Sequence, residues 1–202
     1  MFLFSKLFHK DEKKKETEKN VNPNVVELPC GSFLFGDDPI ETGYEADIDW
    51  YEKTSDLYYQ PVGVFIEVDT PGTKDASIGF ERFTRRYEDR ERIDYRVKLA
   101  VTEHYLGDKD SIVTDCGDTM SKEEFMEELK IEFISIYRSG KRVYHLDFPW
   151  VREGEDGVAV IYDENDEVTV LEETYYHKNF LSLIYPERVS DENDWFNIDL
   201  NT

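Results

Sequence analysis

Residues 130–172 decide the predicted fold, and they read KIEFISIYRSGKRVYHLDFPWVREGEDGVAVIYDENDEVTVLE. Four strands are predicted there, at 131–137, 141–148, 157–162 and 167–172. Ser139-Gly140 joins the first pair and residues 163–166 join the second. Aromatic and β-branched runs bounded by Gly, Ser, Asn and Asp are typical of strands and tight turns. The stretch therefore predicts two consecutive β-hairpins, an antiparallel meander at about 130–172.

A second meander is predicted on the N-terminal side, at about 32–69. Its strands are predicted at 32–35, 46–51 and 58–69. Residues 46–51 alternate polar and apolar side chains, which indicates a strand with one buried face. Pro61 is compatible with the start or the edge of a strand.

The chain between the meanders predicts helices. Apolar residues recur at helical spacing across residues 75–106, in two stripes that do not share one register, which indicates two helices or one bent helix. Ser121 and Glu124 have the spacing of a capping box, which predicts a short helix over 121–129. Two antiparallel meanders with two to three helices packed on the sheet make an α+β fold.

One domain is predicted, over residues 28–189. Residues 1–27 are charge-rich and contain Asn22-Pro23-Asn24, so they are predicted to be a flexible lead-in. Residues 190–202 are predicted to be an acidic tail that can dock on the domain. The lead-in begins with an apolar tip that could make weak peripheral contact with a membrane or dock on the domain: Phe2, Leu3, Phe4, Leu7 and Phe8.

The net charge of −22 is distributed unevenly. Residues 1–20 hold six Lys against four acidic residues, a charge of +2, so the other 182 residues carry −24. Direct binding to a nucleic-acid backbone is disfavoured, because phosphate contacts need Lys and Arg. The charge indicates either a surface that keeps the protein in solution or an acidic face for a basic partner.

No stretch is apolar enough over the roughly 20 residues that a membrane-spanning helix needs, and no secretory signal is visible. The two cysteines, Cys30 and Cys116, lack His or Cys partners at metal-binding spacing. They are most simply free thiols in a reducing compartment, so a cytoplasmic location is expected, and a Cys30–Cys116 disulfide stays open.

The segment Ser121–Gly140, with its capped helix and strand-Gly-strand hairpin, resembles a family of uncharacterised bacterial domains. Gly31-Ser32-Phe33 and Asp49-Trp50-Tyr51 match the N-terminal part of the same family, and the resemblance covers residues 31–172. Some members of that family are similar to immunity proteins of bacterial toxin systems. The chain differs from the family after the hairpin, where residues 148–155 contain no histidine. The resemblance implies a stand-alone domain and no particular enzymatic activity.

Motifs for catalysis, metals and cofactors are weak. The histidines are His9, His104, His145 and His177, and none has the spacing of a metal motif. His104 fits the core-facing stripe of a helix, and His145 fits a surface or edge position of a strand.

Residues 163–167 carry five oxygen-bearing side chains, which suggests Ca²⁺, but a polar hairpin turn explains them. Acidic neighbours around Cys116 disfavour a reactive thiolate. No cofactor, metal or catalytic residue is predicted.

The remaining sequence feature that suggests a function is a set of acidic residues beside aromatic residues, which is typical of a protein-binding surface. Tyr and Trp supply much of the binding energy of protein interfaces, and acids speed association with a basic partner. The alternative is that these aromatics belong to the core. The predicted partner-binding residues are Asp47, Asp49, Trp50, Tyr51, Tyr58 and Tyr59.

These observations favour a non-enzymatic cytoplasmic domain, immunity-like by its resemblance, that binds a basic protein through an acidic-aromatic surface. Two other classes stay open: an enzyme with a carboxylate-based site, and an acidic mimic of DNA. Two carboxylates within about 5–9 Å of each other in a cleft would indicate the enzyme. Rows of acids at phosphate-like spacing would indicate the mimic.

Overall fold

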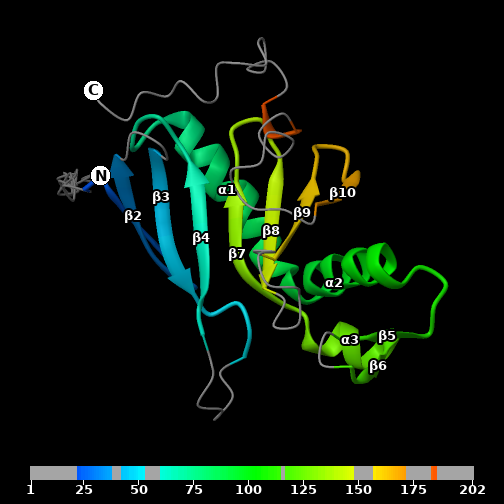
Figure 1. Cartoon of the computed structure of the whole chain (residues 1–202). Helices are drawn as coiled ribbons and strands as arrows, with labels where there is room; N and C mark the ends of the chain where they lie inside the picture. Colours follow the sequence, from blue (N-terminus) through cyan, green and yellow to red (C-terminus); the bar gives the residue numbers. More distant parts are fainter. Residues whose placement is uncertain are drawn as a thin grey trace, which may run out of the picture.

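The computed structural model describes residues 22–37, 42–52, 60–114, 117–147, 157–171 and 183–185. Within these residues the fold is α+β, as the sequence predicts: an eight-stranded sheet, a two-stranded sheet and three helices (Figure 1). The strands are β1 Val25–Leu28, β2 Gly31–Asp37, β3 Thr42–Ile48, β4 Val62–Glu67, β5 Ser111–Val113, β6 Thr119–Ser121, β7 Lys130–Ile136, β8 Arg142–Asp147, β9 Val158–Tyr162 and β10 Val168–Leu171. The helices are α1 Lys74–Glu88, α2 Arg90–Leu106 and α3 Lys122–Glu128.

The two predicted meanders join into one sheet. The strand order is β1-β2-β3-β4-β7-β8-β9-β10, and all neighbours are antiparallel except β4 and β7. The parallel pair places Val64 beside Ile134 and Ile66 beside Ile136. Parallel neighbours need a long crossover connection, and the chain from α1 to α3 supplies it. The sequence predicts both meanders but not this pairing, because the partner strands are about 70 residues apart.

The helices begin and end where local chemistry favours it. Thr73 caps α1 by accepting a hydrogen bond from the backbone N–H of Ala76 (3.3 Å). The chain breaks at Asp89, so the two apolar stripes belong to two helices rather than to one bent helix, the alternative that the sequence left open. The capping box of α3 is present in full, with Ser121 and Glu124 each accepting from the other's backbone N–H.

The main core lies between one face of the large sheet and the helices, of which α1 is seen behind the sheet in Figure 1. Its fully buried side chains include Phe33 and Tyr44 of the first meander, Phe83 of α1 and Val97 of α2. The other face carries a smaller buried cluster at the C-terminal strands, formed by Val143, Ala159, Ile161, Ile184 and Tyr185.

Several boundaries differ from the prediction. Strand β1 begins at Val25, inside the predicted lead-in, because residues 25–28 form a hairpin with β2 around Pro29-Cys30. Strand β3 spans Thr42–Ile48 rather than 46–51, and β4 begins at Val62, after Pro61. The short pair β5–β6 was not predicted. Residues 1–21 and 190–202, including the apolar tip, lie outside the described residues. No helix of the described chain is long and apolar enough to cross a membrane.

Candidate functional site

The structure describes four of the six predicted partner-binding residues, and these four do not share one surface. Asp47 and Asp49 are exposed. Trp50 is only 2% exposed and packs against the ring of Tyr87, with ring centroids 6.1 Å apart. The placement of Trp50 on a binding surface is therefore corrected, because the chain turns the indole into the core after β3 ends. Tyr58 and Tyr59 lie outside the described residues.

The side chain of Tyr51 takes part in a network of hydrogen bonds inside the domain. Its hydroxyl donates a hydrogen bond to Asp94 of α2 (2.8 Å) and accepts one from the backbone N–H of Ile131 (2.8 Å). Lys98 forms an ion pair with Asp94 (2.9 Å) and lies over the Tyr51 ring. Burial and the nearby Asp94 carboxylate raise the pKa of Tyr51. This side chain joins three elements and presents no hydroxyl to a partner.

A small acidic face exists nevertheless, on the side of the sheet away from the helices. Leu34 of β2 lies opposite Glu45 of β3, and Asp47 lies two residues further along the same face. Leu34 is 58% exposed, and both carboxylates are exposed. Across the described ranges neither carboxylate has an ion-pair or hydrogen-bond partner. We call Leu34, Glu45 and Asp47 the acidic face.

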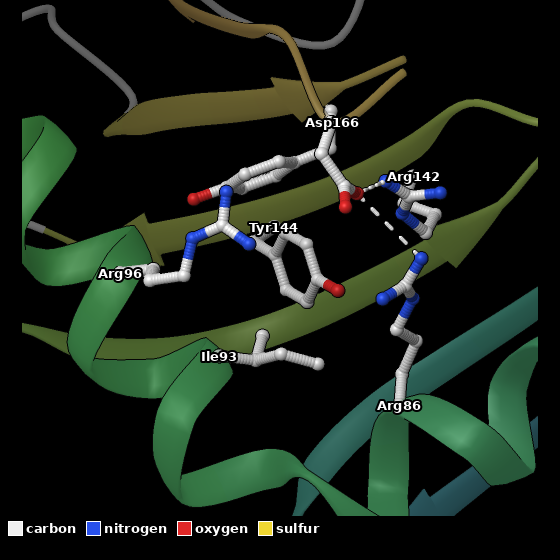
Figure 2. A pocket seen from close by; sticks show the side chains of 7 residues that line it. Arg86, Ile93, Arg96, Arg142, Tyr144 and Asp166 are labelled. Carbon is white, nitrogen blue, oxygen red and sulfur yellow. Dashed lines mark hydrogen bonds and ion pairs between the residues drawn. The ribbon is translucent and has the colours of Figure 1, made fainter. Parts of the chain in front are cut away.

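A second site lies on the helix side, where basic side chains surround a cavity of about 10 Å³. It is lined by Arg86 of α1, Ile93 and Arg96 of α2, Arg142 and Tyr144 of β8, Tyr162 of β9 and Asp166 of the β9–β10 turn. We call these seven residues the arginine pocket. Figure 2 shows the Asp166 carboxylate next to the Arg142 guanidinium and across from that of Arg86.

Arg142 is the fixed centre of the arginine pocket. Its side chain is only 7% exposed, and it donates hydrogen bonds to the carboxylate of Asp166 (2.5 Å) and the backbone carbonyl of Asp163 (2.9 Å). Arg86 lies 3.6 Å from the same Asp166 carboxylate. Arg96 stacks over the ring of Tyr162, with its guanidinium carbon 5.2 Å from the ring centroid.

The electrostatics of the arginine pocket reflect burial and excess positive charge. Burial lowers the pKa of Arg142, and the neighbouring Arg86 lowers it further. Burial raises the pKa of Tyr144 to about 12, so its hydroxyl keeps its proton at neutral pH. Within the described ranges, that hydroxyl has no hydrogen-bond partner and Arg96 has no carboxylate at ion-pair distance.

The acidic turn at 163–167 takes part in this arrangement. The Asp163 carboxylate accepts hydrogen bonds from the backbone N–H groups of Asn165 and Glu167, which is the turn chemistry that the sequence suggests. Glu164 lies 3.9 Å from Arg82, and Asp166 faces Arg86 and Arg142. The carboxylates of Asp163, Glu164 and Asp166 thus point to backbone N–H groups and arginines rather than toward one common point.

Sequence reasoning missed the arginines of the pocket. One signal was visible: Arg142 alternates with Tyr144 and Leu146 along β8, which places a cation on the core-facing side of a strand. The positions of Arg86 and Arg96 gave no such signal, because charged residues on helices are usually solvated.

The histidines and cysteines that the sequence offered as candidates do not form a catalytic or metal site among the described residues. His145 lies on an interior strand, half-buried against the ring of Phe133, so its predicted surface or edge position is wrong. His104 is exposed at the end of α2 rather than in the core. Cys30 is a free thiol, and burial raises its pKa. The described residues contain no cluster of three or more His, Cys, Asp or Glu that could hold a metal ion. His9, Cys116 and His177 lie outside the described residues.

Comparisons with protein-family models, with curated proteins and with solved structures found no match to this chain.

Proposed function

We propose that this chain is a non-enzymatic binding domain whose acidic face holds a basic protein partner. The observation that carries the proposal is the acidic face itself, where an exposed leucine lies beside two exposed carboxylates that the described residues do not neutralise. Apolar contact and complementary charge are the two ingredients of a protein interface that associates quickly and with specificity.

The net charge of the whole chain also favours a positively charged partner. The whole protein carries −22, so a basic partner is attracted over a distance of about one Debye length, roughly 8–10 Å at ordinary salt. The proposal places this binding in the cytoplasm, because Cys30 is a free thiol. An immunity-like role, in which the partner is a toxin, is part of the proposal and rests on the sequence resemblance.

The test compares two charge-reversal variants of the whole chain. Glu45→Lys/Asp47→Lys reverses the acidic face, and Glu103→Lys/Glu127→Lys makes the same charge change at exposed positions of α2 and α3. Each tagged protein is used to capture partners from the producing organism, first at low and then at high salt. A basic protein that the wild type and the helix variant retain at low salt, and the face variant does not, supports the proposal.

Two results would contradict it. Equal loss of the partner from both variants would show that overall charge, not the acidic face, carries the binding. Capture of no specific partner at either salt would remove the basis for the proposal. Circular dichroism of each variant shows that a lost partner does not reflect an unfolded domain.

A further inference from the structure

The arginine pocket has more positive than negative charge. Three guanidinium groups line it, from Arg86, Arg96 and Arg142, against the single carboxylate of Asp166. The other charges near it are already engaged, since Arg82 pairs with Glu164 and Arg92 with Asp89. Burying Arg142 beside Arg86 is costly unless an anion offsets both. Arg142 is buried, whereas Arg86 and Arg96 are half-buried at the rim. An excess of cations around one cavity, in a protein with a charge of −22, indicates a site that is built for an anion.

The arginine pocket also holds hydrogen-bond donors without acceptors. The Tyr144 hydroxyl is protonated, points toward Arg86 in Figure 2, and has no acceptor among the described residues. A guanidinium group only donates, so Arg86 cannot accept that proton. Arg96 likewise has no carboxylate partner in the described part of the chain. Tyr144 lines the cavity, so an acceptor bound there would take a hydrogen bond that no described residue takes.

The Asp166 carboxylate marks where the ligand oxygens would lie. The free cavity of about 10 Å³ has room for only about one water molecule. Asp166, however, belongs to a turn and its side chain is 43% exposed, so the carboxylate can move into solvent. Its departure would leave the facing sides of Arg86 and Arg142 open to another anion.

We propose that the arginine pocket binds a phosphate group, which replaces the Asp166 carboxylate between Arg142 and Arg86. The Tyr144 hydroxyl and Arg96 donate to its remaining oxygens. A phosphate dianion fits better than a carboxylate, because it balances more of the positive charge and its tetrahedral oxygens can meet donors from three elements. The phosphate can be the free ion or a phosphate ester.

The proposal is independent of the acidic face, which lies on the other side of the sheet. The experiment is isothermal titration calorimetry of the whole chain with inorganic phosphate, O-phospho-L-serine and acetate at one ionic strength. Arg96→Gln removes a lining cation that has no ion pair, so the fold is expected to remain intact. Arg85→Gln is the matched control: it removes one cation from a side chain of α1 that is 74% exposed.

We expect phosphate or phosphoserine to bind, Arg96→Gln to weaken binding by about tenfold, and Arg85→Gln to change it by less than about twofold. Tighter binding of phosphoserine assigns the site to a phosphate ester, and tighter binding of inorganic phosphate assigns it to the free ion. The proposal is overturned by no binding of either phosphate, by equal binding of acetate, or by equal weakening in the two variants.

Discussion

The hydroxyl of Tyr51 accepts a hydrogen bond from the backbone N–H of Ile131, a residue 80 positions further along the chain. The register of β7 against β8 shifts between Ile131 and Phe133, so the backbone is irregular at this point. The same hydroxyl donates to Asp94. One side chain of the first meander therefore secures the start of β7 and the middle of α2.

Tyr51→Phe tests this link. The change leaves the N–H of Ile131 without its acceptor and removes one donor from the Asp94 carboxylate, which keeps its ion pair with Lys98. We therefore expect a loss of about 1–3 kcal/mol in the free energy of unfolding. Urea denaturation measures it. Tyr95→Phe removes the same atom from a side chain that is 57% exposed and should cost almost nothing. Equal effects of the two changes would show that the Tyr51 hydroxyl contributes no stability.

Gly63→Ala tests the contact between β4 and β7. A Cβ atom at Gly63 would lie 2.4 Å from the ring of Phe133, which lies over the glycine. We expect a destabilisation of about 1–3 kcal/mol from the forced shift of that ring. Gly36→Ala, on β2, meets nothing within 4 Å and is the matched control.

The cause is checked by combining Gly63→Ala with Phe133→Ala. If the ring is what the added methyl group meets, the two effects will not add, and the double variant will recover part of the loss. Additive losses would place the strain elsewhere in the sheet.

Asp166→Asn tests the charge balance of the arginine pocket. Losing the carboxylate leaves Arg142 buried beside Arg86 without an anion, so stability should fall by about 1–3 kcal/mol. Added phosphate should then raise the melting temperature of the variant more than that of the wild type, because the internal competitor is gone.

Glu164→Gln is the control for that experiment, since it removes a neighbouring carboxylate of the same turn that faces Arg82. Its response to phosphate should equal that of the wild type. An Asp166→Asn protein that phosphate stabilises no more than the wild type would contradict the exchange of anions in the pocket.

His145 should make stability depend on pH. Burial lowers its pKa from 6.5 to about 4 in the folded chain, so the unfolded chain takes up the proton first as pH falls. The contribution of the neutral, buried His145 to the free energy of unfolding is fully present above pH 6.5. It is lost between pH 6.5 and about 4, with a slope of at most about 1.4 kcal/mol per pH unit.

His145→Gln should flatten this part of the pH profile, as measured by urea denaturation at several pH values. NMR titration of the imidazole of His145 reports its pKa directly. A titration near the ordinary value of about 6.5 would contradict the effect of burial.

Local patterns were enough to predict the two meanders, the helical region at 75–106, and the capping box at Ser121 and Glu124. Each of these depends on residues close in sequence, whose periodicity or hydrogen bonding is visible without a fold. The sequence also placed Asp47 on a strand, and the structure leaves it exposed.

Only the tertiary structure decided what those elements bring together. The parallel pairing of β4 with β7 joins segments about 70 residues apart, and no local pattern encodes such a partner. The same is true of the core position of Trp50, and of Arg86, Arg96 and Arg142, which come from three separate elements. Charge can be counted from the sequence, but whether a charge is buried and what faces it depend on packing between distant segments.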